Sequence, residues 1–338
     1  MSAGALMAGE MAEQPARLAA LVARRKEVAR EVRPLLVGAA GAVVAARGSS
    51  DHAATTGRYL LEMAMRRPVA AASPSILSLY GVDVDFSGYL VVGASQSGRT
   101  PEIADYVVQA GRRGARTIAI TNDATSPLAQ AAQAVVELGA GEERAVPATK
   151  TVTAEMVAFA LVAASLEDVV GDAAWEALAA QAAAALADPG PMDALADWLR
   201  GASRLVLVAR GPMSGAAAET ALKLEETSSL LATAFSANDL RHGPIALASS
   251  TIQVLALVHP GPAAAGVLEL CDELVARGAD VRVLGPVPGA AAGWDAAAPE
   301  QLAPVLAVIR GQQLAHALAL RVGADPDRPA GLTKVTAT

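Results

Sequence analysis

The stretch Gly88-Tyr-Leu-Val-Val-Gly-Ala94, followed by Ser95-Gln-Ser-Gly-Arg-Thr100, decides the fold. A short apolar run bounded by glycines predicts a strand buried on both faces, and residues 101–111 after it predict a helix. The same unit precedes it, where the apolar residues 41–46 run into Arg47-Gly-Ser-Ser50 and a helix over 51–65, and residues 116–121 predict the next strand. Continuous apolar strands that alternate with helices are typical of a parallel sheet covered on both faces.

The second half of the chain repeats this pattern. Residues 203–211 read Ser-Arg-Leu-Val-Leu-Val-Ala-Arg-Gly, and further strands are predicted over 251–258 and 280–284. We therefore expect an α/β protein of two tandem lobes. The predicted segments are an N-terminal helix over 1–37, with its amphipathic part at 12–36, a first lobe over 38–188, a second over 189–325 and a C-terminal arm over 326–338. The alanine-rich residues 173–187 are interpreted as the linker between the lobes.

Composition excludes several classes of protein. The 338 residues carry a net charge of −7 with no concentrated Lys/Arg stretch, so we expect no nucleic-acid partner. One cysteine and four scattered histidines cannot form a Cys/His zinc site within one chain. Prolines cut the weakly charged stretch 241–269, and Glu10 and Glu13 interrupt the N-terminus, so neither a membrane span nor a secretory signal is predicted. A soluble cytoplasmic protein is the expectation.

Hydroxyl side chains follow two strands of the first lobe. In an open parallel sheet, ligands bind beyond the carboxyl ends of the strands, where helix N-termini favour phosphate. The candidate phosphate-binding residues are Ser49, Ser50, Ser95, Gln96, Ser97 and Thr100. The alternative is that Ser97 and Thr100 only cap the next helix, since Thr100-Pro101 is a favourable N-cap and N1 pair. The corresponding loop of the second lobe, His259-Pro-Gly-Pro262, has no hydroxyl.

A second group of candidates lies in the second lobe and the arm. Helical spacing puts Glu219, Lys223 and Glu226 on one face, although a solvated ion pair would have the same spacing. His242 precedes Gly243-Pro244 in a predicted loop over 235–244, where it could turn toward a site or only cap or pack. Lys334 lies near the end of an arm that Pro326 and Pro329 are expected to extend, and a terminal lysine is usually solvated.

Together these residues resemble the sugar isomerase (SIS) family, in particular the isomerase half of glucosamine-6-phosphate synthase and the stand-alone amino-sugar-phosphate deaminases. The motifs that carry the resemblance are Arg47-Gly-Ser-Ser-Asp-His52, Ser95-Gln-Ser-Gly-Arg-Thr100, Pro147-Ala-Thr-Lys-Thr-Val-Thr-Ala154, Ala221-Leu-Lys-Leu-Glu-Glu226, Leu240-Arg-His-Gly-Pro244 and Gly331-Leu-Thr-Lys334. The resemblance implies two flavodoxin-like, doubly wound SIS lobes.

The resemblance also implies roles for these residues. Glu226 would move a proton between C1 and C2, and His242 would open the ring. Lys334 would hold the open-chain carbonyl and Lys223 would polarise the sugar oxygens. In the family the histidine loop comes from the neighbouring subunit, which implies a homodimer. This chemistry needs an acid, a base and a cation, so no metal or redox cofactor is expected.

Departures from the family pattern affect the expected substrate. The sequence has no N-terminal glutaminase domain, so we do not expect it to hydrolyse glutamine. Glu225 stands where the synthases have a second lysine, and Ala148 where serine is common. The residues Leu332-Thr-Lys-Val-Thr336 are closer to the deaminases than to the synthases.

Three functions stay open at this point. The first is an amino-sugar 6-phosphate deaminase/isomerase that converts glucosamine 6-phosphate to fructose 6-phosphate and ammonia. The second is a lyase that dehydrates N-acetylglucosamine 6-phosphate after the same proton abstraction at C2. The third is a sugar-phosphate sensor without catalysis, although a binding module has no need of Glu226, His242 and Lys334 together.

Overall fold

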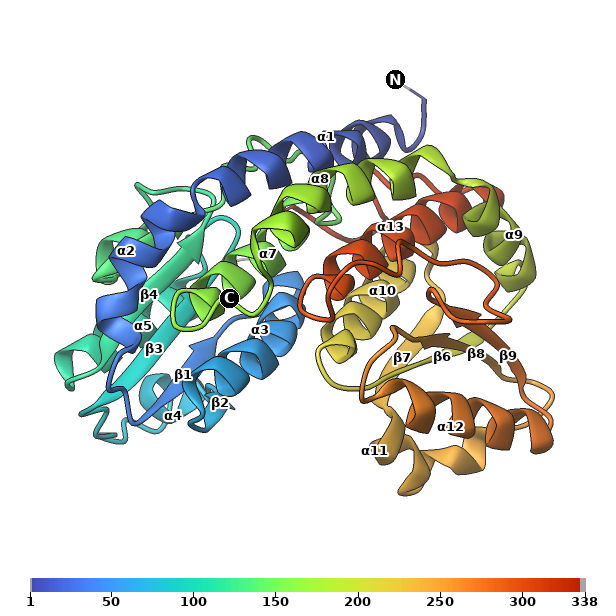
Figure 1. Cartoon of the computed structure of the whole chain (residues 1–338). Coiled ribbons are helices and arrows are strands. Elements are labelled where there is room, and N and C mark those ends of the chain that lie inside the picture. Colours follow the sequence, from blue (N-terminus) through green and yellow to red (C-terminus); the bar gives the residue numbers. More distant parts are fainter. Residues whose placement is uncertain (1, 335–338) are drawn as a thin grey trace. The chain divides into compact units, whose positions relative to one another are not determined.

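The computed structural model describes residues 2–334, which form two compact units (Figure 1). The serine unit, named for its hydroxyl loops, contains residues 16–142 and 150–176. The lysine unit, which holds Lys223 and Lys334, contains residues 2–15, 143–149 and 177–334. The predicted segment boundaries after residues 37, 188 and 325 stay predictions, and residues 1 and 335–338 of the end segments lie outside the described residues.

The serine unit is built on a parallel sheet with the strand order β2-β1-β3-β4-β5. The register pairs Ala45 of β1 with Gly93 of β3, so these two strands end side by side. Its strands are β1 (Gly41–Ala45), β2 (Val69–Ala71), β3 (Tyr89–Ala94), β4 (Arg116–Thr121) and β5 (Ala134–Glu137). Its helices are α2 (Arg25–Leu36), α3 (Ser49–Met65), α4 (Ser75–Ser78), α5 (Pro101–Arg112), α6 (Pro127–Ala131) and α7 (Lys150–Ala164), together with the second part of α1 (Ala5–Ala23).

Helices cover both faces of this sheet, as its apolar strands require. Val91 of β3 and Ala119 of β4 pack with Ile103 and Val107 of α5, so α4, α5 and α6 cover one face. The helices α2, α3 and α7 cover the other face (Figure 1). Helices α3 and α7 approach closely at Gly57, where a Cβ would lie 2.4 Å from the Phe159 ring.

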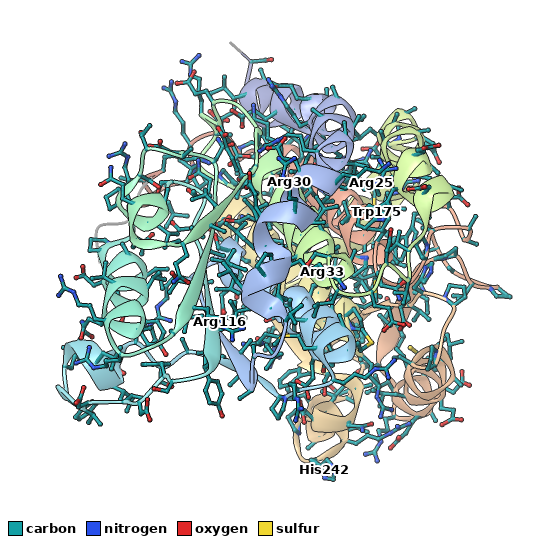
Figure 2. The ribbon with its side chains drawn as sticks, turned by 60° about the vertical axis from the view of Figure 1, so that its left-hand side comes forward. Arg25, Arg30, Arg33, Arg116, Trp175 and His242 are labelled. Atoms are coloured by element: carbon teal, nitrogen blue, oxygen red, sulfur yellow. The ribbon has the colours of Figure 1, made fainter. Side chains whose placement is uncertain are left out.

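Arginine side chains close two helix ends in this unit (Figure 2). Arg33 donates to the carbonyls of Ser165, at 2.6 Å, and Leu166, just after the end of α7. Arg116 donates to the carbonyls of Leu35 and Val37 at the end of α2. A guanidinium satisfies the last free carbonyls of a helix and complements the negative end of its dipole.

The lysine unit repeats the winding with one strand fewer, in the order β7-β6-β8-β9. Its strands are β6 (Arg204–Ala209), β7 (Leu231–Ser236), β8 (Gln253–Leu257) and β9 (Asp280–Leu284). Its helices are α8 (Asp172–Ala187), which begins in the serine unit, α9 (Gly190–Leu199), α10 (Met213–Ser228), α11 (Ala237–Arg241), α12 (Ala264–Ala276) and α13 (Ala303–Arg321), with the short 3₁₀ helix η1 (Pro244–Leu247).

The two faces of this sheet carry different helices. Val206 and Val254 pack with Leu240 of α11 and Leu270 of α12 on one face. Helices α10 and α13 lie on the other face (Figure 1). The α10–α13 contact is again close at a glycine, because a Cβ on Gly311 would lie 2.2 Å from the Thr220 hydroxyl. The fold thus confirms the predicted α/β class with two parallel sheets flanked by helices.

Two local predictions were wrong, the single N-terminal helix and the loop over 235–244. The expected single helix over 12–36 is two helices, α1 and α2, separated at Arg24, which is not helical. The expected linker over 173–187 does contain the boundary between the two units, after Glu176, and it is helical, as part of α8, consistent with the high helix propensity of alanine. The expected loop over 235–244 contains the end of β7 and all of α11; the missed strand reads Leu-Ala-Thr-Ala-Phe-Ser and has no long apolar run.

The described arm also differs from its prediction. Residues 322–334 form neither helix nor strand but a series of turns, with Arg328 N–H bonded to the Asp325 carbonyl and Leu332 N–H to that of Pro329. Among residues 2–334, no helix is long and apolar enough to cross a membrane.

Candidate functional site

The predicted phosphate-binding residues lie at the switch point of the serine unit's sheet. The chain leaves β1 toward β2 on one side and continues through β3, β4 and β5 on the other. Parallel sheets bind ligands at this point, beyond the carboxyl ends of the two central strands. Ser49 and Ser50 are the first two residues of α3, which begins two residues earlier than the predicted Asp51, and residues 95–100 connect β3 to α5.

The loop after β3 is tightly folded around a hydroxyl pair. The Ser95 and Thr100 hydroxyl oxygens lie 3.1 Å apart. Gly98 has a φ of +62°, and a Cβ there would lie 2.0 Å from the Ser126 hydroxyl oxygen, so only glycine fits. Thr100 occupies the N-cap position of α5, yet its side chain makes no capping hydrogen bond. The Thr100 hydroxyl therefore lies with Ser95 at the strand end and does not cap the helix.

The other predicted residues of the loop make local contacts. Ser97 Oγ accepts a hydrogen bond from the Arg99 N–H at 3.2 Å, a bond within the loop before α5 that caps no amide of the helix. The Gln96 carbonyl accepts from the Asn122 N–H, so the β3 and β4 loops support each other. The Gln96 and Ser97 side chains are partly exposed.

A buried carboxylate contacts the other hydroxyl loop. Ser50 donates to Glu155 Oε1 at 2.8 Å, and the two residues are only 7% and 1% exposed. The Ser50 proton is thus engaged, while its oxygen can still accept. Sequence reasoning missed Glu155, although a signal was available: it is the only charged residue between Val152 and Ala164. A lone carboxylate in an apolar helix indicates a buried polar partner.

The arginines that flank these loops are already paired. Arg47 pairs with Glu102 at 2.8 Å, and Arg99 pairs with Asp123 at 2.8 Å. Hydrogen bonds from the Thr125 hydroxyl and backbone, aided by Arg99, lower the pKa of Asp123. The loops at this switch point carry hydroxyl side chains and backbone amides beside the N-termini of α3 and α5, which suits a phosphate bound at helix N-termini.

The second predicted cluster lies on α10. The Lys223 ammonium lies 3.3 Å from Glu219 Oε1 and hydrogen-bonds Glu226 Oε2. Burial disfavours the charged form of Lys223, but the carboxylates of Glu219 and Glu226 outweigh it and raise the pKa of the lysine. The side chains of Glu219 and Lys223 are buried, whereas that of Glu226 is 20% exposed. A solvated surface pair is therefore ruled out, and Glu226 is the carboxylate that a ligand can reach.

Lys334 pairs with a residue that the sequence did not single out. Its ammonium donates to Glu143 Oε2 at 2.9 Å, and the Glu143 side chain is fully buried. Glu143 Oε1 accepts from the backbone N–H and hydroxyl of Thr149. Lys334 is therefore held against the loop before α7 and is not a freely solvated chain end.

His242 does not join the α10 cluster within this unit. It lies exposed at the C-terminal end of α11 (Figure 2), with its backbone N–H bonded to the Asp239 carbonyl. Helix α11 lies on the face of the sheet opposite α10 (Figure 1). Among residues 2–334, no three His, Cys, Asp or Glu side chains come together as metal ligands.

Two doubly wound parallel sheets, one with hydroxyl loops at its switch point, define an α/β protein of the class that binds small ligands at strand ends. Comparison with known families makes the assignment specific. The SIS domain model matches residues 35–165 and 198–286. The chain belongs to the SIS domain family.

Its relatives are sugar-phosphate enzymes by name. The chain is 32% identical over 311 residues to glutamine–fructose-6-phosphate aminotransferase (isomerizing) of Gloeobacter violaceus, covering 86% of this chain and 51% of the relative. The enzyme of the same name from Pyrobaculum aerophilum is 32% identical, with 97% and 56% covered. The chain thus spans about half the length of these curated relatives.

Solved structures agree with this assignment. A candidate phosphosugar isomerase from Silicibacter pomeroyi DSS-3 superposes with a TM-score of 0.86 at 32% identity, covering 95% of this chain and 99% of that one. The glucosamine-6-phosphate deaminase of Thermotoga maritima superposes with a TM-score of 0.79 at 21% identity, covering 99% and 100%, and shows the shared fold.

Proposed function

We propose that this protein is an amino-sugar 6-phosphate isomerase/deaminase that converts glucosamine 6-phosphate and water to fructose 6-phosphate and ammonia. The observation that carries the proposal is the α10 cluster, in which a partly exposed carboxylate, Glu226, hydrogen-bonds a buried, charged lysine. The names of the relatives support a sugar 6-phosphate as substrate, and the hydroxyl loops of the serine unit offer donors suited to its phosphate.

The reaction proceeds by proton transfers that these side chains can perform. His242 moves a proton from O1 to O5 as the ring opens and exposes the C1 aldehyde. Glu226 removes the C2 proton and returns it to C1, while the C2 amine loses a proton and O1 gains one, which leaves an alcohol at C1 and an imine at C2. Water then adds to the imine and ammonia leaves, giving the C2 ketone. Lys334 donates to the oxygen that becomes negative during the transfer, and Lys223 holds the Glu226 carboxylate in place through their hydrogen bond.

The position of His242 supports a homodimer as the active form. On α11 the imidazole lies on the face of the sheet opposite α10, so an intrachain route to the Glu226 carboxylate is disfavoured (Figure 1). We therefore propose that a second copy of the chain supplies His242. Mixing an inactive H242A protein with an inactive E226Q protein should then restore up to about a quarter of wild-type activity, as random subunit exchange in a dimer predicts.

The E226Q variant tests the proposed function itself. Incubation of wild-type protein with glucosamine 6-phosphate should release ammonia and fructose 6-phosphate in equal amounts. E226Q should lower kcat about 10²–10⁴-fold, the usual contribution of a general base. E225Q is the matched control, because Glu225 is the exposed neighbour on the same helix, and its kcat should stay near that of wild type.

Three results would reject this assignment. Ammonia release that is unchanged in E226Q would remove the role of that carboxylate. An ultraviolet-absorbing product from N-acetylglucosamine 6-phosphate, without ammonia from the free amino sugar, would identify the lyase instead. Binding of both sugars without turnover would identify a sensor.

A further inference from the structure

The carboxylate of Glu143 binds Lys334, the last described residue of the C-terminal arm. Its side chain is fully buried, and the Thr149 backbone N–H and hydroxyl both donate to Oε1, at 2.9 and 3.2 Å. The second oxygen, Oε2, receives the Lys334 ammonium at 2.9 Å. Two donors fix Oε1, and they thereby also fix the direction in which Oε2 points. The hydrogen bond from Lys334 to Oε2 therefore sets the position of the ammonium.

The chain that leads to Lys334 is anchored at two aspartates, Asp325 just before the arm and Asp327 within it. Asp325 accepts from the Gly4 N–H, and Asp327 accepts from the N–H groups of Leu6 and Met7, at 2.9 and 2.8 Å. These are the otherwise unpaired donors at the start of α1, so the arm caps that helix. Asp327 is only 5% exposed.

The loop that carries Glu143 is anchored to the same two elements. Glu10 of α1 accepts from the backbone N–H groups of Arg144 and Ala145, and the Asp327 carbonyl accepts from the Val146 N–H at 3.1 Å. The first turns of α1, the loop 143–149 and the arm therefore form one hydrogen-bonded clasp within the lysine unit.

We propose that Glu143 is a positioning residue for the proposed reaction, which holds the Lys334 ammonium at a fixed point, and that the clasp of α1 with the arm delivers Lys334 to it. The inference rests on the proposed function for its kinetic consequence. Chain ends are poorly ordered unless they are tied down, and a cation assists catalysis best when it is preorganised. By binding the Lys334 ammonium, Glu143 both holds this part of the arm in place and preorganises the cation.

Kinetics of three variants test the catalytic part. E143Q should lower kcat about 10–100-fold and change KM for glucosamine 6-phosphate less than threefold. In the K334A background the same substitution should cost less than threefold, because Glu143 then has no ammonium to position. E143D should recover part of the loss. D172N, which removes the exposed Arg25–Asp172 ion pair, is the matched control and should leave kcat unchanged. Equal losses from E143Q with and without Lys334 would overturn the proposal.

Amide hydrogen exchange tests the clasp without reference to activity. E143Q should speed exchange at 328–334 while leaving the first turn of α1 protected. D327A should speed exchange in both segments. Unchanged exchange at 328–334 in E143Q would overturn the inference. If the wild-type protein turns over no amino-sugar phosphate, the proposed function fails, and these exchange rates still decide whether Glu143 holds the arm.

Discussion

The two sheets have the same winding, but their switch points have different chemistry. In the serine unit the loops after β1 and β3 carry Ser49, Ser50, Ser95 and Thr100. In the lysine unit the loop after β8 reads His259-Pro-Gly-Pro262, and its two prolines lack an N–H donor. The comparison teaches that topology provides a position for a ligand, whereas side chains decide whether the position is used.

The histidine at the second switch point is fixed for packing. The Trp294 indole N–H can only donate, so His259 Nδ1 must accept, and Nε2 then donates to the Ala298 carbonyl at 2.9 Å. The imidazole is therefore neutral. Burial lowers the pKa of His259, consistent with that form. A hydrogen-bonded histidine therefore occupies this strand end, whereas the corresponding loops of the serine unit carry hydroxyl side chains.

The helix pairs behind the two sheets also correspond. The α3–α7 contact depends on Gly57 against Phe159, and the α10–α13 contact depends on Gly311 against Thr220. The close approach is the same, but the glycine lies on the first helix of one pair and on the second helix of the other. The buried polar groups differ as well, with Ser50–Glu155 in one pair and Glu219–Lys223–Glu226 on α10 in the other.

The largest effect on stability is expected at the charged cluster. K223M removes the ammonium that the Glu219 and Glu226 carboxylates share, and the free energy of unfolding should fall by about 3–5 kcal/mol, as for a broken buried ion pair. Urea unfolding would measure this. The double variant E219Q/K223M should recover part of the loss. A loss no greater than that of D172N, which breaks an exposed pair, would contradict a buried cluster.

The switch-point comparison itself is tested by phosphate binding. Because only the serine unit carries hydroxyl loops, the chain should bind one phosphate and not two, as measured by calorimetry. S95A and T100A should each raise KM for the sugar phosphate about 10–100-fold with little change in kcat, since a hydrogen bond to a charged group contributes about 1.5–3 kcal/mol. T125A, which removes a hydroxyl after β4, is the control. A binding stoichiometry of two would break the comparison.

A smaller effect is expected from His259 on acidification. Since the folded protein disfavours the imidazolium, stability from the neutral ring is present at pH 7 and is lost as the pH falls through the ordinary pKa of 6.5. Between pH 7 and pH 5 the wild type should lose up to about 2 kcal/mol more than H259F. Thermal unfolding of both proteins at the two pH values measures this. Equal losses of unfolding free energy in the two proteins would show that the buried state of His259 does not disfavour its protonation.

Sequence patterns predicted the regular elements well where they were strongly apolar. The strands β4 and β9 match their predicted residues 116–121 and 280–284, because alternating strand and helix patterns are local signals. The local signal was weak where the chain is uniformly small and apolar, and α8 and β7 were missed for that reason. The break at Arg24 has no cue in the amphipathic pattern.

The candidate site residues that local sequence patterns could place were predicted, whereas their partners from distant segments were not. The hydroxyls of Ser49, Ser50, Ser95 and Thr100 could be placed at one sheet edge from the sequence, because the ends of neighbouring parallel strands must meet there. Their partners could not be found this way. Glu155 is 105 residues from Ser50 and Glu143 is 191 residues from Lys334, and neither separation follows from any periodicity.

The sequence by itself determined two wound sheets, the hydroxyl loops of the first and the shared helix face of Glu219, Lys223 and Glu226, because each depends on residues close together in the chain. Tertiary structure alone decided that this cluster is buried, that His242 lies on the face opposite α10 and that Lys334 ends on Glu143. These outcomes depend on burial and on contacts between distant segments, and such contacts form only when the core packs.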